Sequence, residues 1–170
     1  MKVLAIIDMQ KDFIDGALGT KEAVAIVPAV AARLQQARSS GETVVFTRDT
    51  HHADYLSTQE GRNLPVPHCL EGSEGWQIDA ALPVGDSLVF DKPGFGSPAL
   101  IDYLAHLPEL EAVEFIGLCT DICVITNAMM LKGARPEVPI RVRAACCAGV
   151  TPQSHENALA AMKQCQIEIM

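Results

Sequence analysis

The sequence lacks an excess of positive charge, a long apolar run and a large set of aromatic side chains. Its 170 residues contain 13 Lys and Arg against 21 Asp and Glu, a formal net charge of −8, and aromatic residues make up only 5%. A surface of this charge repels phosphate backbones and anionic lipid headgroups, so we expect no nucleic-acid partner and no membrane partner. No stretch approaches the roughly 20 apolar residues of a membrane-spanning helix.

We also expect no secretory leader, because the apolar run after Lys2 already ends at Asp8. We therefore expect a cytoplasmic protein. Its six cysteines, at positions 69, 119, 123, 146, 147 and 165, are then expected to be free thiols and not three disulfides. Linkers, repeats and low-complexity tracts are absent too, which predicts a single domain over residues 1–170.

Short apolar runs alternate with segments of helical periodicity. The predicted strands are Val3–Ile7, Thr43–Thr47, Ser87–Phe90, Val113–Leu118, Pro139–Ala144 and a last short one at Ile167–Ile169. The predicted helices are Glu22–Arg38, Pro98–His106, Ile122–Lys132 and Thr151–Gln164, with loops at Met9–Thr20 and Thr50–Gly85. Continuous apolar strands that alternate with helices predict an α/β fold in three layers, α/β/α, with a mostly parallel, Rossmann-like sheet of five to six strands.

The stretch Val113–Val124, V-E-F-I-G-L-C-T-D-I-C-V, contains a candidate nucleophile. The apolar strand breaks at Cys119, and a helix that Thr120 or Asp121 can cap begins after it. Cys123 would lie in the first turn of this helix, where free amide groups and the helix dipole favour a thiolate. The alternative is a small buried residue that packs well.

Four predicted strands each deliver an ionisable residue to the same edge of the sheet. Asp8, Asp49 with His51, and Lys92 follow the first three strands, and the fourth leads to Cys123. Ligands bind at this edge of an open parallel sheet. Lys92 would stabilise the thiolate, and Asp8 could accept the thiol proton and return it to a leaving group. Taken singly, each could also be a surface or capping residue.

A candidate metal site accompanies these residues. Asp49 and His51 are two residues apart and point the same way in an extended segment, and His68 could supply a third ligand. Two histidines and one carboxylate, with open positions, are typical of a catalytic metal site. His52 would face away, and Cys69 is an alternative ligand to its neighbour His68. Zinc is the default ion, and iron, manganese or cobalt also fit; the alternative is solvent-facing loop histidines.

Several separated motifs carry a family resemblance. They are A-I-I-D-M-Q-K-D-F at residues 5–13, D-T-H at 49–51, P-V-P-H-C at 65–69, Lys92, and G-L-C-T-D-I-C-V at 117–124. With these motifs the chain resembles the isochorismatase-like cysteine hydrolase superfamily, and most of all its nicotinamidase-related amidases. The resemblance extends over essentially the whole chain.

The resemblance implies specific roles. Asp8, Lys92 and Cys123 would form the catalytic triad, a cis peptide would join Leu118 to Cys119, the amides of Cys119 and Cys123 would form the oxyanion hole, and Asp49, His51 and His68 would bind a divalent metal. The implied activity is metal-assisted hydrolysis of a small carboxamide, nicotinamide to nicotinate and ammonia in NAD salvage, through a thioester on the cysteine. A homo-oligomer is also implied.

Two tryptophans common in nicotinamidases are replaced here, by Thr50 and by Pro65. The second helps to wall the pyridine ring. Trp76, the one tryptophan of the chain, could be a replacement wall or part of the core. Phe13 and Phe95 are the remaining candidates for contact with the substrate ring.

Two other functions stay open. Related cysteine hydrolases cleave carbamoyl, ureido or other small amide groups, whereas the vinyl-ether cleavage of isochorismatases uses no cysteine and is disfavoured by Cys123. A thiol redox protein or a catalytically silent binding module is the third reading, motivated by the six cysteines. The C-x3-C spacing of Cys119 and Cys123 differs from the C-x2-C spacing of redox motifs, which speaks against it.

Overall fold

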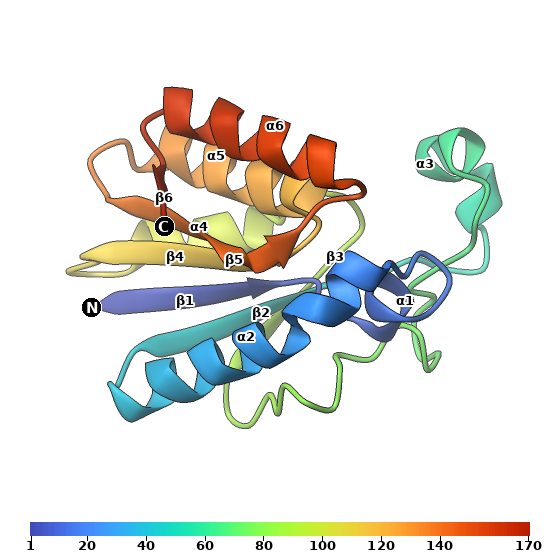
Figure 1. Cartoon of the computed structure of the whole chain (residues 1–170), viewed down its shortest axis with the longest axis horizontal. Coiled ribbons are helices and arrows are strands. Elements are labelled where there is room, and N and C mark those ends of the chain that lie inside the picture. The colour runs from blue at the N-terminus through green and yellow to red at the C-terminus, as the bar shows by residue number, and fades with distance from the viewer.

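Six strands form one sheet in which every neighbouring pair runs parallel. The computed structural model describes residues 1–170, and its sheet has the order β3-β2-β1-β4-β5-β6 (Figure 1). The strands are β1 Lys2–Ile7, β2 Thr43–Asp49, β3 Leu88–Lys92, β4 Ala112–Leu118, β5 Ile140–Ala148 and β6 Glu168–Ile169. The predicted fold class is confirmed, with six strands. The strand order reverses between β1 and β4, and ligands bind at such a point.

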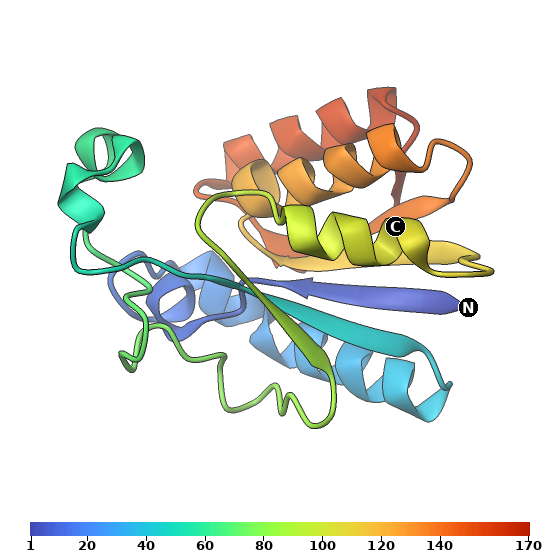
Figure 2. The same cartoon turned by 180° about the vertical axis from the view of Figure 1, so that it is seen from behind.

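Helices cover both faces of the sheet. These helices are α2 Lys21–Ser39, α4 Pro98–His106, α5 Ile125–Ala134 and α6 Pro152–Gln164. Figure 1 shows α2 on one face and α5 and α6 on the other, and Figure 2 shows α4 beside α5. Covered on both sides, Val3–Ile7 of β1 is at most 1% exposed, which explains why its sequence is apolar without alternation. None of the helices has the length and apolar character needed to cross a membrane.

Both predicted loops contain helical turns, which is a correction to the sequence analysis. Helix α1, Lys11–Ile14, lies within the first loop, and the second contains the 3-10 turn η1, Tyr55–Ser57, and helix α3, Gln59–Asn63. Thr58 starts α3 by accepting a hydrogen bond from the amide of Gly61 at 3.0 Å. These turns are too short to show a hydrophobic period. Figures 1 and 2 both show α3 projecting from the body of the molecule.

The start of the helix after β4 also differs from the prediction. Thr120–Val124 forms a π-helical turn, η2, before α5, and its N-cap is Cys119, which makes no side-chain capping bond. Thr120 and Asp121 do not cap the helix, because their side chains bond to His155 and to the amide of Val150 instead.

The ends of β1 and β4 lie unusually close together at Gly117. This glycine has φ +118°, and a Cβ on it would lie 2.1 Å from the carbonyl oxygen of Ile7. Only glycine fits this backbone conformation and this separation. The contact places Asp8, which follows β1, next to the turn that follows β4.

Candidate active site

Lys92, the last residue of β3, lies at the centre of a buried cluster. Its Nζ is 2.6 Å from Oδ2 of Asp8, 3.5 Å from Sγ of Cys123 and 3.5 Å from Oδ1 of Asp49. It also donates a hydrogen bond to the carbonyl oxygen of Gly94 at 2.9 Å. The lysine is 1% exposed, so it is not the solvated lysine that was the alternative. The structure thus brings together Asp8, Lys92 and Cys123.

Asp8 is fully buried and held from two sides. Its Oδ1 accepts a hydrogen bond from Thr47 Oγ1 at 2.6 Å, while Oδ2 faces Lys92. Burial raises the pKa of Asp8, and the positive charge of Lys92 only partly opposes this effect. A carboxylate whose pKa is raised accepts a proton more readily than an ordinary aspartate does.

The pKa of Cys123 is shifted in the direction opposite to the one that the sequence predicts. Burial, with the nearby charge of Asp8, raises the pKa of Cys123, although Lys92 acts to lower it. Burial would also lower the pKa of Lys92, but Asp8, Cys123 and Asp49 outweigh it and raise that pKa, so the lysine keeps its positive charge. The helix start was expected to favour a thiolate, and burial of the sulfur acts in the opposite direction. A proton moved from Cys123 to Asp8 shifts the negative charge from one neighbour of Lys92 to another.

The turn Cys119–Cys123, here called the nucleophile turn, follows β4. The peptide bond between Leu118 and Cys119 is cis, as the resemblance implies. The amide N–H of Cys119 makes no hydrogen bond within the chain. An unpaired amide beside a nucleophile is available to a developing oxyanion.

The predicted metal ligands lie together with a fourth residue, Glu60. Ligand atoms of Asp49, His51, Glu60 and His68 all lie within 4.8 Å of one another. Nε2 of His51 is 2.8 Å from Asp49 Oδ2, and Nε2 of His68 is 3.4 Å from the same oxygen. Oε1 of Glu60 is 3.5 Å from His51 Nε2 and 3.6 Å from His68 Nε2.

Sequence reasoning missed Glu60 because it stands in α3, inside a segment predicted to be irregular. The available signal was Thr58 two residues earlier, a residue type that caps helices and here caps α3. His52 lies outside the cluster, largely exposed and 3.3 Å from Glu71. Cys69 is buried but also outside it, and its amide donates to Asp12 Oδ2 at 2.7 Å.

The cluster has the features of a divalent metal site. Nε2 of His51 is buried without a hydrogen-bond partner despite its closeness to Asp49. Nδ1 of His68 lies 2.8 Å from the carbonyl oxygen of Val66, which leaves Nε2 of the ring free to bind an ion. Burial lowers the pKa of His51, but the carboxylates of Asp49 and Glu60 outweigh it and raise the pKa to about 9. Two carboxylates facing two imidazoles favour a cation between them.

The backbone of Asp49 is fixed by a buried glutamine. Oε1 of Gln10 accepts from the Asp49 amide at 2.7 Å, and Nε2 of Gln10 donates to the Asp49 carbonyl oxygen at 2.8 Å. Because Gln10 lies two residues after Asp8, the same short segment positions a residue of the triad and a residue of the metal cluster.

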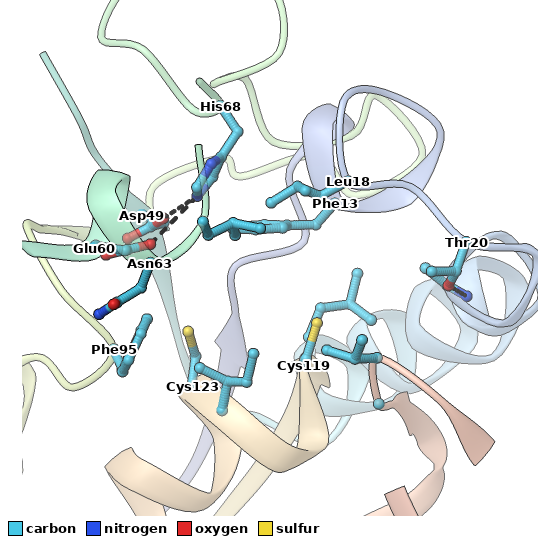
Figure 3. A pocket seen from close by; sticks show the side chains of 16 residues that line it. Phe13, Leu18, Thr20, Asp49, Glu60, Asn63, His68, Phe95, Cys119 and Cys123 are labelled. Carbon is cyan, nitrogen blue, oxygen red and sulfur yellow. Dashed lines mark hydrogen bonds and ion pairs between the residues drawn. The ribbon is translucent and has the colours of Figure 1, made fainter. Parts of the chain in front are cut away.

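One cavity of about 330 Å³ connects Cys123 with the candidate metal cluster. Its walls include Phe13, Leu18, Leu64, Phe95 and Val150, and Figure 3 shows Phe13 and Phe95 on different sides of it. The ring of Phe13 lies 5.4 Å from that of His68. Both predicted ring contacts thus line the cavity, although Phe95 is 47% exposed.

Trp76 does not line this cavity. Its Nε1 donates to Thr50 Oγ1 at 2.9 Å, and the Arg48 guanidinium lies 3.6 Å from the ring centroid. Trp76 therefore supports the segment between β2 and the metal loop, and it does not replace the missing pocket wall.

Comparisons with known proteins agree with this geometry. The isochorismatase domain model matches residues 2–170. The nicotinamidase of Escherichia coli is 26% identical over 95% of this chain and 90% of its own length. The nicotinamidase/pyrazinamidase of Mycobacterium tuberculosis is 27% identical over 100% of this chain and 98% of its own length. The pyrazinamidase of Pyrococcus horikoshii, solved in complex with zinc, is 27% identical with a TM-score of 0.87, covering 99% of this chain and 98% of that one. The chain belongs to the isochorismatase family.

Proposed function

We propose that this protein is a metal-assisted cysteine amidase that hydrolyses nicotinamide to nicotinate and ammonia. The family match and the nicotinamidase relatives identify the chain as an amidohydrolase of linear amides. The observation that carries the finer proposal is the position of Lys92. Its Nζ contacts Asp8, Cys123 and the metal ligand Asp49, so one ammonium joins the nucleophile, the base and the metal cluster.

In the first half of the proposed reaction, Cys123 attacks the carboxamide carbon while its proton passes to Asp8. Lys92 stabilises the negative charge on whichever partner carries it. The amides of Cys119 and Cys123 donate to the oxyanion of the tetrahedral intermediate. Asp8 then protonates the leaving amine, which departs as ammonia, and the acyl group stays on Cys123 as a thioester.

In the second half, Asp8 takes a proton from a water molecule as that water attacks the thioester carbon. The same two amides hold the second oxyanion. The C–S bond breaks, the carboxylic acid is released, and the proton on Asp8 returns to the sulfur of Cys123. One water is consumed for each ammonia released.

Asp49, His51, Glu60 and His68 would hold the divalent ion, which we propose to be zinc. When bound, such an ion supplies a Lewis acid that binds and orients the ring nitrogen of the substrate. The protein's own part is to fix the four ligands, through the clamp of Gln10 on Asp49 and the bond from the His68 ring to the backbone.

The cavity walls favour an uncharged substrate. Ten of its 16 lining residues are hydrophobic, and its charged groups are the carboxylates Asp49 and Glu60, with no arginine or lysine among them. A carbamoyl or ureido acid would bring a carboxylate into a cavity whose lining side chains include no arginine or lysine, so that only the proposed metal ion could pair with it. Nicotinamide carries no charge, and its flat ring suits the space beside Phe13 and Phe95.

The test is ammonia release from a panel of amides, with and without prior removal of metal by a chelator. The panel contains nicotinamide, pyrazinamide, benzamide and an N-carbamoyl amino acid. We expect nicotinamide to be hydrolysed, benzamide to be poor because it lacks the ring nitrogen, and chelation to reduce turnover. No ammonia from any amide by pure, zinc-loaded protein would refute the proposal, and faster cleavage of the carbamoyl compound would favour the alternative.

A further inference from the structure

Two side chains tie the nucleophile turn to the start of α6. Thr120 Oγ1 lies 2.7 Å from His155 Nδ1. The carboxylate of Asp121 accepts from the amide of Val150 at 3.1 and 3.4 Å. Thr120 is 0% exposed, and His155 stands in the first turn of α6, where its amide donates to the carbonyl oxygen of Thr151. None of these groups takes part in the proposed chemistry.

We propose that His155 is a positioning residue for the oxyanion hole and that it acts through Thr120. The inference rests on the proposed amide hydrolysis. The imidazole forms a hydrogen bond with the Thr120 hydroxyl. Thr120 directly follows Cys119, whose unpaired amide would donate to the oxyanion. His155 itself touches neither the substrate nor the reacting atoms.

Backbone hydrogen bonds close the nucleophile turn on itself but do not attach it to α6. The amides of Ile122 and Val124 both donate to the Cys119 carbonyl oxygen at 3.1 Å, and the Ile125 amide donates to the carbonyl oxygens of Ile122 and Thr120. The Thr120 hydroxyl has His155 as its one hydrogen-bond partner. Loss of that bond frees the residue next to the oxyanion donor, and a displacement of about 1 Å at a reacting centre can cost ~100-fold in rate.

The fold is built to bring His155 this close. Gly149 follows β5, and a Cβ on it would lie 2.8 Å from the His155 nitrogen and 3.0 Å from its Cα. A residue without a side chain therefore lets the first turn of α6 lie against the end of the sheet. The other ring nitrogen of His155 makes no hydrogen bond within the chain, and the ring borders a surface groove near Glu22 and Glu156. Replacing the ring thus removes one internal interaction.

Paired variants separate the hydrogen bond from the bulk of the side chains. His155→Phe and Thr120→Val remove the bond and keep most of the shape. His155→Asn keeps a polar atom at the position of Nδ1, and Thr120→Ser keeps the hydroxyl. His106→Phe, at an exposed histidine of α4, is the matched control for loss of a histidine. We expect kcat for amide hydrolysis to fall ~10- to 100-fold in His155→Phe and Thr120→Val, with KM within about twofold of wild type. His155→Asn and Thr120→Ser should recover most of the wild-type kcat.

Two further measurements distinguish positioning from general damage. Alkylation of Cys123 by iodoacetamide needs no oxyanion hole, so its rate should stay within about twofold of wild type in His155→Phe. Amide hydrogen exchange in the peptide spanning residues 117–124, followed by mass spectrometry, should be faster in His155→Phe than in wild type or His155→Asn.

Two outcomes would overturn the inference. One is a His155→Phe variant with wild-type kcat and wild-type exchange, and the other is an equal loss of kcat in His155→Phe and His155→Asn. If the wild-type protein hydrolyses no amide, the proposed function fails. The exchange comparison still decides whether His155 holds the nucleophile turn.

Discussion

Asp8 and Lys92 form a fully buried ion pair that spans a strand. Asp8 follows β1 and Lys92 ends β3, two strands that are not neighbours in the sheet, and the Lys92 side chain passes the end of β2 to place Nζ 2.6 Å from Asp8. On the way it comes within 3.5 Å of Asp49. The positive charge of Lys92 therefore compensates the negative charges of two buried carboxylates, and neither would have a nearby lysine or arginine without it.

Lys92→Met should accordingly cost stability as well as activity. It leaves Asp8 and Asp49 buried without a cation, and removal of one partner from a buried pair costs about 3–5 kcal/mol. The double variant Asp8→Asn/Lys92→Met should be less destabilised than Lys92→Met alone, because one buried charge is gone. Urea unfolding gives both free energies. A double variant that is less stable than the single one would contradict this account of the pair.

The two cysteines of the nucleophile turn should react very differently with iodoacetamide. Burial raises the pKa of both thiols, so the expected difference comes from their neighbours: Cys123 has Lys92 at 3.5 Å and Asp8 as a base, whereas the first charged group that acts on Cys119 is Asp121, which raises its pKa further. We expect the first equivalent of reagent to modify Cys123, as located by peptide mass spectrometry. Cys119→Ala should leave that rate nearly unchanged, and in Cys123→Ala the thiol of Cys119 should react slowly. Equal labelling of both would remove the main support for Cys123 as nucleophile and revive the redox reading.

Glu60→Gln should weaken metal binding. The substitution removes a carboxylate that lies 3.5 and 3.6 Å from the two imidazoles, and we expect affinity for zinc to fall at least ~10-fold. Competition with a chelating dye measures this without reference to activity. Glu71→Gln is the matched control, since Glu71 pairs with the exposed His52 outside the cluster. Equal affinities in the two variants would exclude Glu60 as a ligand.

A second charged cluster, away from the active site, predicts a pH dependence of stability. Glu114 of β4 accepts hydrogen bonds from Arg33 of α2 at 2.9 and 3.1 Å and from Arg143 of β5 at 2.7 Å. Burial acts to raise the pKa of Glu114, but the two arginines outweigh it and lower the pKa. A carboxyl group with a lowered folded-state pKa adds stability above its unfolded value of about 4.3, and this contribution is lost as the pH falls through the folded value.

The free energy of unfolding of Glu114→Gln should therefore be ~3 kcal/mol below that of wild type at pH 7. This difference should shrink as the pH falls below about 4. Urea unfolding at a series of pH values measures the gap directly. A gap that stays constant down to pH 3 would show that the side chain's shape matters and its charge does not.

The sequence predicted the sheet well because buried parallel strands have a continuous apolar signature, as in Val3–Ile7. It also predicted that Asp8, Asp49 and Lys92 lie at strand ends, since charged residues stop all three apolar runs. It could not reveal Glu60, because a five-residue helix has no measurable period. It also gave the wrong direction for the Cys123 pKa, because the depth of burial depends on the packing of the whole domain. One domain, a cytoplasmic location and a homo-oligomer stay predictions.

The lack of a Cβ at Gly117 affects how closely Asp8 and Cys123 can approach each other. Because Gly117 and Ile7 touch where β1 and β4 end, the two segments that follow, one with the base and one with the thiol, start from a minimal separation. Any larger residue there would push the strands apart at the reactive edge. The distance that the proposed proton transfer between Asp8 and Cys123 must cover is thus set inside the sheet, by a residue that has no part in the proposed reaction.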